Sequence, residues 1–335
     1  MPLPGTSHHP PINPRSPLRY ALIRLIRFVI VFVLVTFIVM VTTRIGSKDP
    51  VRDLAGGQVS PAVIEQVKED YPYLDKPIVV QYGYWLKDMV TGDMGYSYAQ
   101  AQPVTEMFQQ RGPVTFFLGF WAVFLGLIIA VPIGVYAAYR RDGPFDRTTS
   151  LGSFAAISTP PLVLGVFALY FTKNFSFFPS LSEYVAPWSN PMEHFKNFFL
   201  PALTLGLGLG AVWSRLLRAD MALTLQSDFI NLARAKGVSP NRVLWVHALR
   251  SSILSLITSV ALQMSGLVSG AVVAEQFFNF GGVGIRLVTA VQQNDILTIQ
   301  AITAVVVAIV VAVNLIVDLF YAVIDPRIRQ MRALA

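Results

Sequence analysis

The chain has 335 residues, of which 13% are charged and 54% are hydrophobic, and its formal net charge is +7. Soluble domains carry roughly 25% charged residues, so this composition argues against a soluble enzyme and against intrinsic disorder. Cysteine is absent, which excludes disulfides, thiolate metal sites and cysteine nucleophiles. A small basic excess on an apolar chain favours a membrane protein over a nucleic-acid-binding protein.

Six segments are apolar over roughly the 20 residues that a helix needs to cross a bilayer. The sequence therefore predicts an all-α integral membrane protein with spans at residues 21–43, 113–139, 151–171, 199–217, 251–274 and 296–324. Residues 1–20 are rich in Pro and His and are predicted to be a disordered tail. A cleaved signal peptide is the other interpretation of the first span, but its apolar run is longer than a typical signal core and no A-x-A site follows it.

Basic residues predict the orientation of these spans. With both termini in the cytoplasm, including a C-terminal tail at 325–335, the inner segments carry +11 and the outer segments carry −3. Asp318, in the sixth span, adds the last negative charge. An excess of Lys and Arg on the cytoplasmic side sets membrane orientation. The basic charge is therefore explained by the orientation of the spans, and no nucleic-acid partner is expected.

The loop after the first span, residues 44–112, lies outside in this orientation. Ser60 followed by Pro61 predicts a helix start, with Ser as N-cap and Pro at the first helical position. Aromatic residues then alternate with Gly83, Gly92 and Gly95. Two interpretations fit this pattern: a structured cap on the membrane surface, or a belt of aromatic side chains at the interface.

The second long loop, residues 218–250, lies in the cytoplasm and interrupts a core of five spans at 113–324. Residues 220–236 are predicted to be helical and to end at Gly237, and Ser239 with Pro240 predicts a new helix start. Arg234 and Lys236 add positive charge before the turn. The alternatives are a helix that docks in a groove of a partner protein and a solvated basic loop.

The inventory of reactive residues predicts neither a catalytic nor a metal site. The histidines are too dispersed for zinc or a serine triad, since His194 and His247 lie on opposite sides of the membrane and His8 and His9 lie in the tail. No Gly-Lys dipeptide occurs, which excludes a Walker A loop. The glycines at 206, 208 and 210 predict close helix packing. Any ATP must therefore be handled by another chain.

A polar stripe marks the fifth span. Ser251, Ser255, Ser259 and Gln263 recur every four residues and share one helix face, which Gly270 extends. Gly266 and Gly270 form a small-x-x-x-small pair suited to helix crossing. Polar groups at membrane depth face protein or water, so the stripe indicates either a substrate passage or polar contacts between helices. In the third span, Pro160-Pro161 predicts a bend, which could serve as a gate or as packing geometry.

Several short motifs run along the chain. The cytoplasmic run Leu232-Ala233-Arg234-Ala235-Lys236-Gly237-Val238-Ser239 is followed by Val246-His247-Ala248-Leu249-Arg250. The others are Leu74-Asp75-Lys76-Pro77, Gly92-Asp93-Met94-Gly95, Asp146-Arg147, Glu275-Gln276-Phe277-Phe278, Gly282-Val283-Gly284 and Asp325-Pro326-Arg327. Together they resemble the membrane subunits of ABC importers, specifically the peptide/nickel permease family. The long outer loop resembles the first of two paired permeases, closest to dipeptide and oligopeptide systems.

The resemblance implies a type I ABC importer permease in a bacterial cytoplasmic membrane, with no enzyme activity and no cofactor in this chain. ATP and Mg²⁺ would be bound by one or two cytosolic ATPase subunits. These would contact an EAA-type coupling loop formed by Ala233, Arg234, Ala235, Lys236, Gly237, Val238, Ser239, Pro240 and Asn241. The other implied partners are a second homologous permease, an extracytoplasmic binding protein or lipoprotein, a peptide substrate and membrane lipid.

Two further groups complete the predicted site. The translocation path is assigned to Ser255, Ser259, Gln263, Gly266 and Gly270, and an outer-face loop to Glu275, Phe277, Gly282 and Gly284. The alternatives to peptide import are a nickel or glutathione importer of the same family and an ion-driven secondary transporter. The last would require an acidic residue at mid-membrane, and Asp318 lies off-centre.

Overall fold

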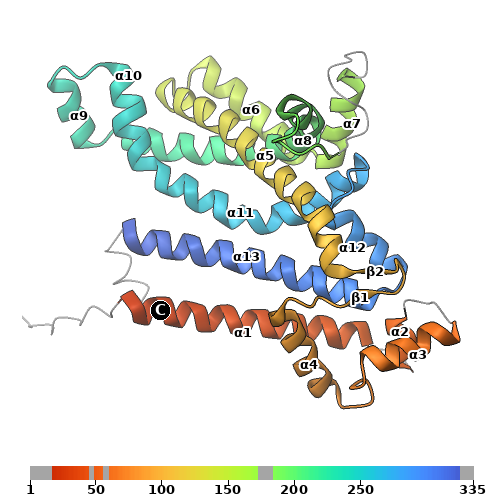
Figure 1. Ribbon diagram of the computed structural model, residues 1–335. Coiled ribbons are helices and arrows are strands. Elements are labelled where there is room, and N and C mark those ends of the chain that lie inside the picture. Colours follow the sequence, from red (N-terminus) through yellow and green to blue (C-terminus); the bar gives the residue numbers. More distant parts are fainter. Residues whose placement is uncertain (1–16, 45–48, 56–59, 173–183, 325–335) are drawn as a thin grey trace, which may run out of the picture.

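The computed structural model describes residues 17–44, 49–55, 60–172 and 184–324, and this part of the chain is almost entirely helical (Figure 1). Within these residues five helical stretches are long and apolar enough to cross a membrane. A sixth crossing is added if a bent pair of shorter helices counts as one span. The long helices are α1 (Pro17–Arg44), α5 (Val104–Tyr139), α8 (Pro191–Thr224), α11 (Leu249–Phe277) and α13 (Ile296–Ile324). The predicted all-α class is confirmed.

Several helices extend beyond the predicted spans. Helix α1 begins at Pro17, within the predicted tail, whose residues 1–16 lie outside the described part of the chain, as does the tail at 325–335. Helix α5 begins at Val104 and continues through Pro113, where the sequence predicted its start, and α8 runs from Pro191 to Thr224. The apolar segments mark only the membrane-embedded part, whereas the backbone hydrogen bonds of a helix continue into its polar ends.

The predicted third span is two helices, α6 (Pro144–Ser158) and α7 (Pro161–Thr172), whose axes meet at 109°. Pro160 and Pro161 have no N–H groups to continue the ladder of α6. The Thr159 hydroxyl and amide both donate to the Ala155 carbonyl, at 2.7 and 3.1 Å, and end the helix there. The bend predicted at Pro160-Pro161 is confirmed, and it divides the predicted span at 151–171 into two helices.

Helices α5 and α8 form the centre of the bundle through backbone contact at glycines. A Cβ on Gly206 would lie 2.9 Å from the Ala122 carbonyl oxygen, and one on Gly210 would lie 3.0 Å from that of Gly126. Trp213 is fully buried and covers Gly126. The close packing predicted for the glycine cluster is thus present at 206 and 210, while Gly208 faces open space.

The segment between α1 and α5 folds into a small cap. It contains α2 (Pro50–Leu54), α3 (Pro61–Asp70), α4 (Ile78–Thr91) and an antiparallel pair, β1 (Tyr96–Ser97) with β2 (Gln102–Pro103). Helix α3 begins at Pro61, as predicted. The cap core packs against Leu297 of α13, and the Tyr82 hydroxyl lies 2.8 Å from Thr36 Oγ1 of α1. These contacts fix the cap to the first and last long helices.

Helix α8 ends at Thr224, and a separate short helix, α9 (Asp228–Ala235), follows. The prediction of one helix over residues 220–236 was therefore wrong. Ser227 adopts an extended N-cap backbone and its hydroxyl donates to the Thr224 carbonyl at 2.6 Å, so the chain turns between the two helices. After Gly237 and a two-residue connection the chain is helical again. The short helix α10 (Pro240–Arg242), the π-helical stretch η1 (Val243–Ala248) and α11 follow one another without a gap. The restart predicted at Pro240 is confirmed.

The elements gather at two opposite ends of the bundle (Figure 1). The start of α1, the end of α13, and α9 with α10 lie at one end (left in Figure 1). The cap and α12 (Val283–Gln292) lie at the other end. The predicted coupling loop and the predicted outer-face loop are thus separated by the length of the long helices.

Candidate coupling loop, pathway helix and outer-face site

The predicted coupling loop is built around a left-handed glycine. Gly237 is the second residue after the end of α9, and its backbone φ is +78°. Its N–H donates to the Arg234 carbonyl at 2.9 Å, and the Val238 N–H donates to the Ala233 carbonyl at 3.2 Å. This pair of bonds is a Schellman motif, in which a residue with positive φ reverses the chain at a helix end. The motif fixes the angle at which α9 leaves toward α10.

The loop is anchored at one point and exposed elsewhere. Ile230 of α9 is fully buried and packs in a cluster with Val243, Leu244 and Ala248. By contrast, 234–237 and 239–242 are exposed, and Ala233 and Val238 are half-buried. Large apolar side chains are also exposed nearby, Phe229 and Leu232 on α9 and Trp245 and Val246 on η1. An exposed apolar group beside charged residues is typical of a protein interface.

Two basic side chains complete this surface. Arg234 and Lys236 are exposed on either side of Ala235. Among the described residues, no carboxylate lies within ion-pair distance of either side chain. Their positive charge is therefore not neutralised within the described chain and is available to an acidic surface.

The polar stripe of α11 faces away from the chain's own core. Ser251 and Ser255 are exposed, and Ser259 and Gln263 are half-buried and joined by a 3.2 Å hydrogen bond. Other positions of α11 carry the buried side chains Ser252, Leu256, Ala261, Leu267 and Ala271. The stripe is thus open to water or to another subunit.

The two glycines of the predicted path have different surroundings. A Cβ on Gly266 would meet nothing within 4 Å, whereas a Cβ on Gly270 would lie 3.1 Å from Leu205 Cδ2 of α8. Gly266 therefore continues the open face, and Gly270 serves the crossing of α11 with α8.

Glu275, Gly282 and Gly284 of the predicted outer-face loop form one buried cluster. The Glu275 carboxylate is fully buried at the end of α11 and accepts hydrogen bonds from Thr115 Oγ1 (2.6 Å) and the Ile285 N–H (2.9 Å). It thereby caps the first turn of α12, where a negative charge is favourable. A Cβ on Gly282 would overlap this carboxylate, and one on Gly284 would lie 2.8 Å from it.

Phe277 occupies a separate place. Its ring is half-buried and would lie 3.0 Å from a Cβ on Gly165 of α7. It packs perpendicular to Phe278, with ring centroids 5.0 Å apart. Phe277 therefore joins α11 to the bent pair, and none of these four residues offers a large exposed surface to a partner.

A buried ion pair beside this cluster was not predicted. Arg286 Nη2 of α12 lies 2.6 Å from Asp295 Oδ2, which also accepts from the hydroxyls of Ser97 (2.5 Å) and Thr298 (2.8 Å). Burial lowers the pKa of Arg286, and the charge of Asp295 opposes this shift. The network joins the cap strand β1 to both α12 and α13. In the sequence, the one signal for this pair was an arginine and an aspartate, Arg286 and Asp295, in a largely apolar segment.

Asp146, in the second cytoplasmic turn, also pairs with a distant arginine. Arg218 of α8 donates from Nε to Oδ1 at 3.0 Å and from Nη2 to Oδ2 at 2.5 Å, and the carboxylate is buried. Such a bidentate contact fixes both side chains in orientation as well as distance. It ties the start of α6 to α8.

Family models match most of the chain. The model of the binding-protein-dependent transport system inner membrane component covers residues 130–330, and the N-terminal model of the same kind of membrane component covers 17–119. A putative peptide transport system permease protein of Brucella abortus (strain 2308) is 33% identical over 90% of this chain and 94% of that protein. The oligopeptide transport system permease protein AppB of Bacillus subtilis is 34% identical over 88% of this chain and 94% of its own length.

A glutathione transport system permease protein, GsiC of Pectobacterium atrosepticum, is 32% identical over 93% of this chain and 99% of its own length. Among solved structures, an inward-facing MetNI methionine ABC transporter matches 63% of this chain and 95% of its own at 19% identity, with a TM-score of 0.49. The two family models and the relatives span the bundle, the coupling loop and the cap alike. The chain belongs to the family of binding-protein-dependent transport system inner membrane components, the multi-pass permease subunits of ABC importers.

Proposed function

We propose that this permease imports peptides, in a complex with a second permease, cytosolic ATPase subunits and an extracytoplasmic binding protein. The cargo follows from the relatives, which are named for transport of peptides, oligopeptides and glutathione, itself a short peptide. The hydroxyl and amide groups on the open face of α11 support it as well. Such groups exchange hydrogen bonds with amides of any sequence, so they suit a varied peptide cargo.

ATP hydrolysis belongs to the partner subunits in this proposal. The exposed loop from Ala233 to Asn241 would enter a groove of an ATPase subunit, with Phe229 and Leu232 giving apolar contact and Arg234 and Lys236 giving charge. The observation that carries this role is the Schellman turn at Gly237, which holds a short exposed helix at a fixed angle. A rigid element is what transmission of movement between subunits requires.

In the proposed orientation, both termini lie in the cytoplasm. The basic excess of the segments assigned to the inner side, +11 against −3 outside, supports it. So does the arrangement in which α9 and α10 lie at the same end as the start of α1 and the end of α13 (Figure 1). The cap then lies outside, where the binding protein would dock, and the open face of α11 would meet the path and the second permease.

The coupling role is tested by charge reversal. Replacing Arg234 and Lys236 by Glu should weaken co-purification of the ATPase subunits, because the charge offered to their groove changes sign. Glu substitution of Arg140, an exposed arginine at the end of α5, is the matched control. Unchanged co-purification of the double variant would overturn docking at this loop.

The cargo is tested on the cognate binding protein. Mass spectrometry of the solutes that it retains during purification should show short peptides, and transport of those peptides into proteoliposomes should require the complete complex and ATP. Retention of nickel alone, or of glutathione alone, would contradict the broad peptide assignment. Uptake by this chain without ATPase subunits would instead support an ion-driven transporter.

A further inference from the structure

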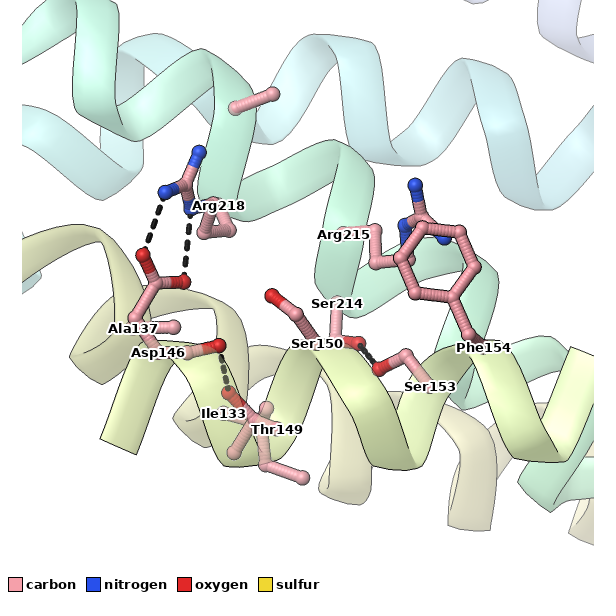
Figure 2. A pocket seen from close by; sticks show the side chains of 11 residues that line it. Ile133, Ala137, Asp146, Thr149, Ser150, Ser153, Phe154, Ser214, Arg215 and Arg218 are labelled. Carbon is pink, nitrogen blue, oxygen red and sulfur yellow. Dashed lines mark hydrogen bonds and ion pairs between the residues drawn. The ribbon is translucent and has the colours of Figure 1, made fainter. Parts of the chain in front are cut away.

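A polar recess lies between α5, α6 and α8, at the end of the bundle where α9 and α10 lie. It has a volume of about 240 Å³. Figure 2 shows Arg218 on one side and Arg215 on the other, with the side chains of Ser150, Ser153 and Ser214 between them. The Ser153 and Ser214 hydroxyls are only 3.5 Å apart. The recess is distinct from the coupling loop, the polar stripe of α11 and the outer-face cluster.

The two arginines of the recess differ in their partners. Arg218 is held by the buried Asp146 carboxylate in the bidentate contact described above. The Arg215 guanidinium stacks on Phe154, with its central carbon 3.7 Å from the ring centroid. Among the described residues, no carboxylate lies within ion-pair distance of Arg215. Arg215 is thus fixed in orientation by an aromatic ring while its N–H donors are left for an anion.

The charge of the lining limits which anion fits. Arg218 is paired with Asp146 and also lies 3.9 Å from the exposed Asp142 carboxylate, so Arg215 supplies the one unpaired positive charge among the lining residues. This matches the single charge of a phosphodiester better than the double charge of a phosphate monoester. The hydroxyl groups between the arginines can exchange hydrogen bonds with a polyol, whereas a quaternary ammonium offers neither a donor nor an acceptor.

The surroundings are those of a lipid site. Leu151 is 70% exposed and Phe154 is 52% exposed, and both lie on α6 beside the recess. An acyl chain can lie along these apolar side chains while its headgroup enters the recess. Basic pockets between membrane helices near the cytoplasmic surface are a recurring way to bind anionic headgroups.

We propose that this recess binds the headgroup of phosphatidylglycerol from the adjacent leaflet. The Arg215 guanidinium donates hydrogen bonds to the phosphodiester oxygens, and Ser150 with the Ser153–Ser214 pair bonds the glycerol hydroxyls. Arg218 acts mainly through its charge, because Asp146 already holds its Nε and Nη2. The bound lipid would join α6 to α8 and stabilise the assembled importer, independently of which cargo it carries.

The experiment measures thermal unfolding of the purified importer complex in neutral detergent during titration with dioctanoyl phosphatidylglycerol. The wild-type complex should show a saturable rise in Tm that dioctanoyl phosphatidylcholine does not reproduce. Arg215→Gln should raise the half-saturating lipid concentration by about tenfold or more, the effect of losing one charge-assisted hydrogen-bonded contact. Arg140→Gln is the matched control, because Arg140 also stacks on an aromatic ring, Tyr136, but lies outside the recess.

Each remaining outcome decides the proposal. An equal loss in Arg140→Gln would reduce the effect to general surface charge and overturn it, as would equal stabilisation by phosphatidylcholine. If inorganic phosphate reproduced the shift in an Arg215-dependent way, the site would take free phosphate, and the lipid assignment would be wrong. If Arg215→Gln failed to assemble, Ser150→Leu, which fills the recess without changing its charge, should give the same loss of lipid response. Normal titration of that variant would overturn the proposal.

Discussion

Arg286 and Asp295 form an ion pair with an N–O distance of 2.6 Å, and each side chain is only 2% exposed. Asp295 lies in the turn after α12. Asn294 takes a left-handed backbone with φ +52°, and the Asp295 N–H bonds back to the Ala290 carbonyl at 2.8 Å. The turn therefore places the carboxylate over the helix that carries its partner. Ser97 of the cap completes the contact from the other side.

We expect Asp295→Ala to lower the free energy of unfolding by about 3–5 kcal/mol, because it leaves the Arg286 charge buried without its partner. Asp49→Ala is the control and should cost about 1 kcal/mol, since it removes an exposed ion pair with Arg52 and one hydrogen bond from the Val51 N–H at the start of α2. Replacing Arg286 by Met and Asp295 by Leu together should recover much of the loss. Denaturant titration of the purified chain in micelles measures all three, and equal losses for Asp295→Ala and Asp49→Ala would contradict the prediction.

Gly282→Ala should destabilise the outer end of α11, because the added methyl group would overlap the Glu275 carboxylate. Moving a buried side chain out of its place costs about 1–3 kcal/mol. Gly281→Ala is a matched neighbour, whose Cβ would lie at an ordinary 3.5 Å from Arg111 Nη1. Thermal unfolding of the two variants should differ by several degrees. Equal Tm values would show that the carboxylate can move at no cost.

Gly237→Ala should impair ATPase stimulation by the loaded binding protein while the complex still assembles. A side chain with a left-handed backbone costs roughly 1–2 kcal/mol, so the turn between α9 and α10 would relax to another angle. Gly237→Asn should retain more stimulation, because Asn tolerates this backbone. Gly83→Ala, within α4 and with no atoms within 4 Å of the added group, is the control. Full stimulation of the Ala variant would remove the turn from the coupling role.

Replacing Ser259 by Val and Gln263 by Leu together should reduce peptide transport several-fold in proteoliposomes while leaving assembly intact. The change makes the open face of α11 apolar, and a peptide amide that passes it would lose its hydrogen-bonding partners. Thr258→Val is the control, because the Thr258 hydroxyl bonds to the Leu254 carbonyl of its own helix at 2.8 Å. Normal transport by the double variant would indicate that the stripe serves contacts between helices.

The sequence predicted those parts of the fold that depend on local chemistry. Apolar length located the long helices, Pro160-Pro161 located the bend, and the Gly237 and Pro240 pair located the turn of the coupling loop. Each of these features depends on backbone donors, dihedral preferences or transfer into lipid, which a short stretch of sequence contains.

Features that depend on distant contacts escaped prediction. The packing of α9 depends on Ile230, which is buried in a cluster with Val243 and Leu244 beyond the turn in sequence. The Arg218–Asp146 pair joins residues 72 positions apart, which only the folded bundle brings together. The Arg286–Asp295 pair spans one turn, but Ser97 of the distant cap completes its network. The side chain of Asp318 lies outside the described residues, so its off-centre position in the membrane stays a prediction.

The glycine contacts between α5 and α8 limit how the transporter can move. Each backbone lies in a depression of the other at Gly126, Gly206 and Gly210, and at Gly134 a Cβ would lie 2.9 Å from the Ser214 carbonyl oxygen. Axial sliding of one helix would drive carbonyl groups into side chains along the whole seam. We therefore expect α5 and α8 to move together as one rigid body. We expect changes of shape during a transport cycle to occur at the joint between α6 and α7 and at the turn after α8.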